Sequence, residues 1–79
     1  MNLLTLKEFN NAHVVYFYQP DGKGEKGEVD YSFTNKTAAV VVRAEEDNNA
    51  EHYGYKAARK IEEVVSEKNL PLEFIQAWY

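Results

Sequence analysis

The chain contains no cysteine, and this absence removes several classes of protein at once. Without thiols there is no disulfide framework, no thiolate zinc site, no iron–sulfur cluster and no cysteine nucleophile. Long apolar runs are missing too: the longest have five residues, whereas a membrane-spanning helix needs about 20. The opening residues Met1–Glu8 lack the basic start and long apolar core of a secretory signal peptide. We therefore expect a cytoplasmic protein with no membrane segment.

Strong charge of one sign is also lacking, because 13 acidic and 9 basic residues leave a formal net charge of only −4. Hydrophobic residues make up 44 % of the chain, which is too much for a disordered protein. The 79 residues fit one domain, since domains usually have about 100–200 residues. We therefore predict a single α+β domain over residues 1–79.

Three segments have the chemistry of β-strands. Residues 13–18 form a nearly continuous apolar run of β-branched and aromatic types, which is typical of an interior strand. Residues 28–34 alternate, so Val29, Tyr31 and Phe33 share one face and polar side chains share the other. Residues 38–44 centre on three consecutive valines. The short loops between these segments favour a three-stranded antiparallel meander.

The two ends of the chain complete the expected fold. Residues 3–11 fit either a short helix or a strand. Thr5 and Glu8 have the spacing of a capping box, and Leu6 and Phe9 lie three apart on one helical face, so we favour a short N-terminal helix. Residues 49–68 form a long amphipathic helix, with Asn48 as its N-cap and Asn69 as a left-handed C-cap. Its core-facing stripe comprises Ala50, Gly54, Ala57, Ala58, Ile61, Val64 and Val65. Residues 72–79 form a fourth strand, and with the interior strand placed second the predicted sheet order is 4-1-2-3.

This architecture supplies more apolar side chains than one helix can cover. Whichever face the helix takes, residues 13–18 leave either Val15 and Phe17 or the set of Val14, Tyr16 and Tyr18 on the other face. The same holds for the last strand, because either of its faces can turn away from the helix. We therefore expect a non-catalytic module that binds a protein or a second copy of itself, through an apolar and aromatic sheet face or an exposed edge. The residues selected for this surface are Tyr16, Tyr18, Ile75, Trp78 and Tyr79.

Two alternatives involve no protein partner at this surface. If the N-terminal segment folds across the apolar face, no interaction surface is needed there. A small-ligand groove on that face is the other alternative.

A nucleic-acid role is an alternative function. The outer helix face gathers His52, Tyr55, Lys56 and Arg59, the one basic and aromatic cluster of the chain. Acidic residues surround it and the net charge is negative, so nucleic-acid binding is disfavoured. A variant of the idea reverses the sign: the acidic residues mimic nucleic acid and occupy a basic site on another protein. The mimic would consist of Glu45, Glu46, Asp47 and Glu51.

The residues that carry chemistry do not form a recognisable site. His13 and His52 lack a second histidine four residues away, so a helical zinc pair is excluded. A nucleophilic triad would need Ser32 or Ser66 beside one of these histidines, together with a pocket and an oxyanion hole. We therefore predict no catalytic residues, no metal and no cofactor.

Overall fold

The structure, a computed structural model, describes residues 1–48 and 51–78. Within them lie five strands and one helix. In chain order these are β1 (Asn2–Phe9), β2 (His13–Pro20), β3 (Gly27–Ser32), β4 (Thr37–Val42), α1 (Tyr53–Val64) and β5 (Glu73–Gln76). The predicted Tyr79 and Ala50 lie outside the described residues. The α+β class is confirmed, whereas the strand count and the strand order differ from the prediction.

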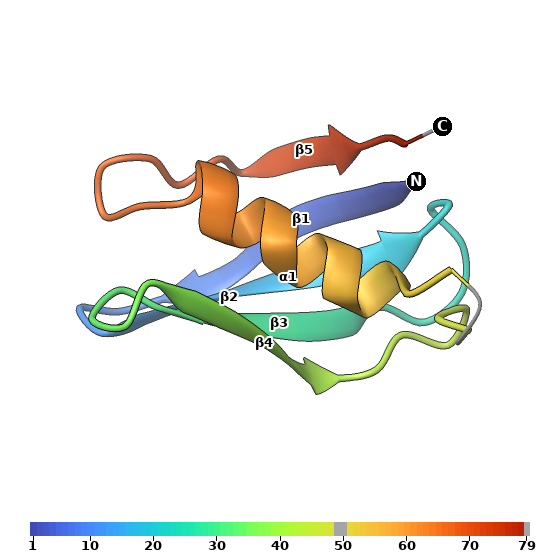
Figure 1. Cartoon of the computed structure of the whole chain (residues 1–79), viewed down its shortest axis with the longest axis horizontal. Helices are drawn as coiled ribbons and strands as arrows, with labels where there is room; N and C mark the ends of the chain where they lie inside the picture. Colours follow the sequence, from blue (N-terminus) through green and yellow to red (C-terminus); the bar gives the residue numbers. More distant parts are fainter. Residues whose placement is uncertain (49–50, 79) are drawn as a thin grey trace.

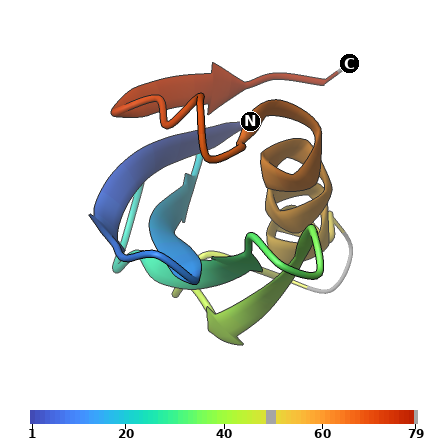
Figure 2. The same ribbon diagram turned by 90° about the vertical axis from the view of Figure 1, so that its left-hand side faces the viewer.

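All five strands belong to one antiparallel sheet with the order β4-β3-β2-β1-β5 (Figure 1). The helix α1 lies across one face of this sheet. Seen along its length, the sheet curls around the helix, with β5 and β4 at its two edges (Figure 2). No helix in the described part of the chain is long and apolar enough to cross a membrane.

The predicted N-terminal helix is wrong, because residues 2–9 form the strand β1. A bulge between Leu6 and Glu8 explains the misleading spacing. It shifts the alternation by one residue, so Leu6 and Phe9 are three apart and still share the helix-facing side of the sheet. Asn10 then turns the chain, since its Oδ1 accepts the backbone N–H of Ala12 at 2.8 Å and of His13 at 2.9 Å.

The position of β1 also corrects the sheet order. The prediction placed the last strand beside residues 13–18, but β1 lies between β2 and β5 and pairs with both. Residues 13–18 are interior, as predicted, although the helix covers only one of their two faces. β4 lies at an edge, where the predicted order had also placed residues 38–44.

The core lies between α1 and the sheet. The predicted helix stripe is confirmed at Gly54, Ala57, Ala58 and Ile61, all of which are buried. From the sheet, the strands contribute Leu4, Val14, Tyr16, Tyr18, Val29 and Tyr31. A Cβ added at Gly54 would come within 2.8 Å of Val40 Cγ2 and 2.9 Å of Tyr18 Oη. The helix therefore approaches the sheet as closely as it does because position 54 has no side chain.

Both helix ends differ from the prediction. The helix is shorter than residues 49–68, and the residue before it, His52, has a left-handed backbone with φ 54°. Asn48 Oδ1 accepts the N–H of Glu51 at 3.1 Å, which is a turn ahead of the helix rather than its N-cap. Asn69 is not among the residues with positive φ, so it is not a left-handed C-cap. Its side chain instead donates to the carbonyl oxygen of Val64 at 2.6 Å.

Candidate interaction surface

The side chains selected from β2 lie in the core. Tyr16 and Tyr18 are both 0 % exposed. The Tyr16 hydroxyl donates to the carbonyl oxygen of Pro71 at 2.7 Å, and the Tyr18 hydroxyl donates to Asp47 Oδ2 at 2.6 Å. Burial raises the pKa of each tyrosine to about 12. This corrects the predicted surface: Tyr16 and Tyr18 face the helix, and the opposite set, Val15 and Phe17, faces away from it.

The residues selected from the C-terminal segment divide between two locations. Ile75 is 59 % exposed and points away from the helix, since its neighbour Phe74 packs edge-on against Tyr16 at 5.8 Å between ring centroids. Trp78 is half-buried and packs on the Tyr53 ring, with a centroid separation of 5.4 Å. Trp78 is thus tied to the start of α1 and is not joined to Ile75 in one patch.

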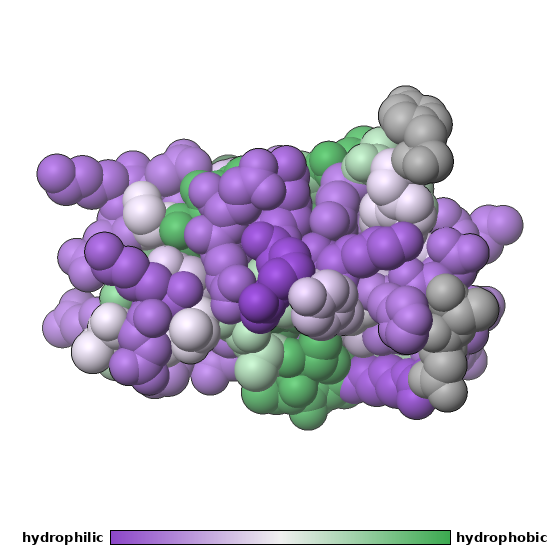
Figure 3. Space-filling model, in the orientation of Figure 1, coloured by the Kyte–Doolittle hydropathy of each residue, from purple (hydrophilic) through white to green (hydrophobic). Residues whose placement is uncertain are grey.

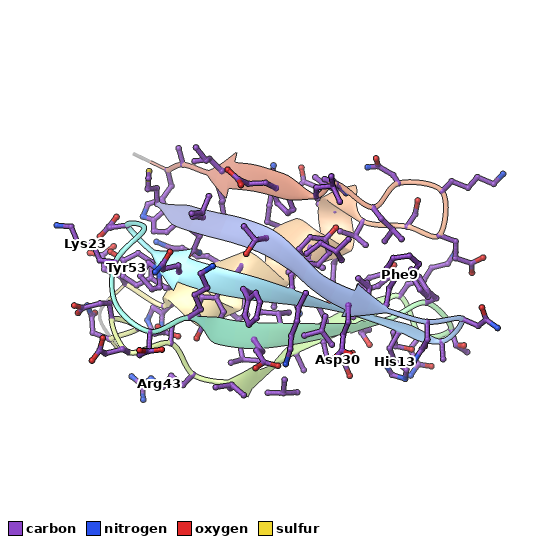
Figure 4. All side chains as sticks on the ribbon, turned by 180° about the vertical axis from the view of Figure 1, so that it is seen from behind. Phe9, His13, Lys23, Asp30, Arg43 and Tyr53 are labelled. Carbon is purple, nitrogen blue, oxygen red and sulfur yellow. The ribbon has the colours of Figure 1, made fainter. Side chains whose placement is uncertain are left out.

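The sheet face opposite the helix is covered by no described element (Figure 4). At its centre an aromatic ring lies among charged side chains. The half-buried Phe17 ring lies 5.6 Å from Lys7 Nζ and 5.2 Å from Lys26 Nζ. Lys7 also forms an ion pair with Glu28 at 2.9 Å, and the hydrogen bond to this carboxylate raises the pKa of Lys7. Such a mixture is ordinary for the solvated face of an antiparallel sheet. The N-terminal segment is part of the sheet, so it does not fold across this face.

A more apolar surface lies along the outer edge of β4. Val40, Val41 and Val42 are 38 %, 58 % and 45 % exposed, and the nearby Tyr55 of α1 is 64 % exposed. We call these four residues the edge patch. The space-filling view shows a cluster of hydrophobic residues along the lower edge of the molecule, over β4 (Figure 3). Val40 and Tyr55 also line a hollow of about 210 Å³.

The backbone explains why these valines are exposed. β4 pairs with β3 on one side only, and its register shifts after Val40, so Val41 is the extra residue of a bulge. The Ala38 N–H donates to Glu62 Oε2 at 2.7 Å and therefore points away from β3. Because alternate residues of a strand point their N–H and C=O groups to the same side, those of Val40 also face outward. The edge offers both apolar side chains and backbone hydrogen-bonding groups.

The opposite edge of the sheet, formed by β5, is less suited to pairing with another chain. β5 has only four residues, includes Glu73 and closely follows Pro71. A short strand, a charge and a proline are features that discourage pairing with another chain. The two edges are therefore not equivalent, and β4 is the open one.

The predicted basic cluster is divided in the structure. Lys56 Nζ lies 4.0 Å from the centroid of the Trp78 ring and 3.9 Å from Glu51 Oε2. Arg59 stacks over Tyr55 at 5.2 Å and pairs with Glu62 at 2.9 Å. Both cations thus have acidic partners within the chain, and His52 occupies the turn before the helix. This geometry adds no support for a phosphate-binding surface.

The predicted acidic mimic is divided as well. Asp47 points inward, where its Oδ2 accepts the Tyr18 hydroxyl and the N–H of Gly54 at 3.1 Å. Glu45 Oε1 accepts the N–H of Glu25 at 3.0 Å and so connects two loops. Glu46 and Glu51 are exposed. Two of the four carboxylates therefore hold the local structure together.

One cluster resembles catalytic components without forming a site. His13 Nδ1 lies 3.1 Å from Asp30 Oδ1, and Ser32 is the residue opposite His13 on β3 (Figure 4). The Ser32 hydroxyl, however, accepts the N–H of Asn35 at 3.2 Å. The group lies on the open sheet face and lines neither the hollow beside Val40 nor the hollow beside Phe9. Among the described residues, no group of three or more histidine or acidic side chains is arranged to hold a metal.

Another hollow lies at the other end of the sheet. It measures about 370 Å³ and lies between the β1–β2 turn and the loop that follows α1. Phe9, which is 60 % exposed, and Leu70 form part of its wall, and Glu67 is its only charged residue. The polar lining otherwise consists of Asn10 and Asn11. A small-ligand site usually places several polar groups around an apolar pocket, and here those groups are the Glu67 carboxylate and two amides.

Comparison of the chain with protein-family models, with curated protein sequences and with solved structures gave no match. Its function is therefore argued from the geometry of the molecule itself. Sequence reasoning missed the edge patch, although the three consecutive valines and the edge position of residues 38–44 were both visible. The combination of these two signals would have identified it.

Proposed function

We propose that this chain is a non-catalytic protein-interaction module that docks through the edge patch. The observation that carries the proposal is the composition of β4, an edge strand with no neighbouring strand on its outer side. It has no charged residue between Thr37 and Val42 and three exposed valines. Exposed apolar edges are hazardous for a soluble protein, because they template pairing with other chains. A partner that covers the edge removes the hazard and gains both apolar contact and backbone hydrogen bonds.

The composition of the patch supports binding to protein rather than to a charged polymer. Its aliphatic members carry no charge, and Tyr55 adds an aromatic ring of the kind enriched at protein interfaces. Arg59, which stacks on that ring, is already paired with Glu62. A partner with an uncharged, extended segment fits this surface better than one that needs many cationic contacts.

The test compares two matched variants in a retention assay. Val41→Glu places a carboxylate in the centre of the patch, and Leu72→Glu places the same charge on another exposed aliphatic residue, 76 % exposed, far from β4 in the chain. Wild type and both variants are immobilised and exposed to soluble extract of the source cells and to the purified chain. The proposal expects a protein that wild type and Leu72→Glu retain and Val41→Glu loses. Identical retention by all three would refute it.

A further inference from the structure

The hollow beside Phe9 combines two aromatic side chains with a carboxylate that has no partner. Phe9, Phe33 and Leu70 supply its apolar wall, and Glu67 is the charged residue that lines it. Among the described residues, no hydrogen bond or ion pair engages the Glu67 carboxylate. The volume of about 370 Å³ lies within the range of small-ligand sites, about 300–1,000 Å³.

Backbone hydrogen bonds hold both walls of this hollow in place. On one side, the Phe33 N–H donates to the carbonyl oxygen of Ala12 at 3.0 Å, which ties the β1–β2 turn to the residue that follows β3. On the other side, Ser66 and Asn69 exchange backbone hydrogen bonds at 3.1 and 3.0 Å, so Glu67 lies in a closed turn. A ligand does not have to order these two segments, and this lowers the entropic cost of binding.

The lining selects the charge of the ligand. A neutral or anionic group in this hollow would remove water from the Glu67 carboxylate without replacing its hydrogen bonds, which is costly. A cation replaces that water, and it is also attracted to the faces of aromatic rings. Lys36 and Lys68 line an adjoining hollow that shares Phe33 and Glu67, yet neither forms an ion pair with this carboxylate. The site therefore suits a cation from outside the chain.

A guanidinium group fits these surroundings better than an ammonium group. It can donate two parallel N–H bonds to one carboxylate and can stack flat on an aromatic ring. An ammonium group is more strongly hydrated, so it loses more on entering an apolar hollow. The same pair of contacts already occurs within this chain, where Arg59 stacks over Tyr55 at 5.2 Å and pairs with Glu62 at 2.9 Å.

We infer that the hollow beside Phe9 binds a guanidinium group carried on an aliphatic stem. Glu67 pairs with the guanidinium, the rings of Phe9 and Phe33 flank it, and Leu70 contacts the stem. This is the chemistry of free arginine and of an arginine side chain in a partner protein. The site shares no residue with the edge patch, so the inference goes beyond the proposed function and does not depend on it.

The first experiment titrates the full chain with three probes of similar shape and follows its backbone amides by NMR. The probes are butylguanidinium, butylammonium and the neutral butylurea, each up to about 20 mM because ligands of this size bind weakly. Butylguanidinium should give saturable shifts at Asn11, Glu67 and Leu70. Butylammonium should bind several times more weakly, and butylurea should give no saturable shift.

The second experiment repeats the butylguanidinium titration on matched variants. Glu67→Gln keeps the size of the side chain and removes its charge, so affinity should fall by about tenfold or more. Phe9→Leu removes one ring and should also weaken binding. Glu46→Gln is the control, because it removes the same charge from an exposed residue of the loop before α1, and its affinity should equal that of wild type.

Two further probes distinguish the sources of the ligand. Tighter binding of N-acetylarginine amide, whose ends are blocked as in a protein, supports an arginine side chain of a partner, whereas tighter binding of free arginine supports the amino acid itself. Three results overturn the inference. They are the absence of saturable shifts with butylguanidinium, equal binding of butylurea, and an unchanged affinity in Glu67→Gln.

Discussion

The hydroxyl of Tyr18 should contribute more to stability than the hydroxyl of Tyr16, although both side chains are fully buried on the same strand. Tyr18 donates to the Asp47 carboxylate at 2.6 Å and accepts the N–H of Ala44 at 3.0 Å. Tyr16 makes one hydrogen bond, to the neutral carbonyl of Pro71. Replacing each tyrosine with phenylalanine removes only the hydroxyl and keeps the ring, so the pair isolates the hydrogen bonds.

The expected magnitudes follow from the charge and number of the partners. A hydrogen bond between neutral groups contributes about 0.5–1.5 kcal/mol, and one to a charged group about 1.5–3 kcal/mol. Tyr16→Phe should therefore lower the free energy of unfolding by about 1 kcal/mol. Tyr18→Phe also leaves the amide of Ala44 without its partner, and it should cost roughly 3 kcal/mol. Asp47 also accepts the N–H of Gly54, so the start of α1 should loosen in the same variant.

Urea unfolding followed by circular dichroism measures both values, and hydrogen exchange at Ala44 and Gly54 reports the local effect. The double variant Tyr18→Phe with Asp47→Ala closes a mutant cycle, in which the coupling energy belongs to the Tyr18–Asp47 pair. Equal destabilisation by Tyr16→Phe and Tyr18→Phe, with no coupling in the cycle, would refute the reasoning. The bond to Asp47 would then contribute nothing beyond burial of the ring.

Three further predictions concern buried groups. Burial raises the pKa of Tyr16 and Tyr18 from 10.0 to about 12, so the stability they contribute is complete below pH 10 and is lost as the pH rises towards 12. Tyrosinate absorbance should show these two of the six tyrosines ionising together with unfolding. Ionisation of all six tyrosines near pH 10 in a folded protein would contradict this prediction. Gly54→Ala should lower the free energy of unfolding by about 1–3 kcal/mol in urea titrations, despite the better helix propensity of alanine. The reason is that the added Cβ comes within 2.8 Å of Asp47 Oδ2 and Val40 Cγ2. A more stable variant would show that the contact relaxes freely. The buried Thr5 Oγ1 has no hydrogen-bond partner, so Thr5→Val should leave the melting temperature unchanged or raise it. A clear loss of stability would contradict this prediction and reveal a bond that the structure does not contain.

The parts of the fold that sequence reasoning predicted are those where the local pattern and the tertiary contacts agree. The alternation over residues 28–34 put Val29, Tyr31 and Phe33 on one face, and all three are buried in the structure. The stripe of Gly54, Ala57, Ala58 and Ile61 is confirmed for the same reason. In each case a single periodicity runs through the element without interruption, so the pattern could be interpreted in one way only.

The prediction failed where a bulge broke the periodicity. In β1 the register shift between Leu6 and Glu8 converts a period of two into an apparent spacing of three, which imitates a helix. That one error removed a strand from the sheet and placed the last strand beside the wrong neighbour. The candidate surface failed for a separate reason: the choice of buried face on β2 was open, and Tyr16 and Tyr18 were assigned to the wrong side. Alternation alone cannot say which face of a strand the helix will cover.

The contrast between the two sheet edges is the strongest structural reason to associate β4 with binding. An edge can be protected by charge, by proline, by shortness or by a bulge. β5 combines three of these through Glu73, the preceding Pro71 and its four residues. β4 has a bulge and one covering carboxylate, since Glu62 occupies only the N–H of Ala38. The bulge does not hide apolar surface there, because Val41 and Val42 are the residues that it exposes. An edge left open in a chain that protects its other edge is better explained by a partner than by incomplete protection.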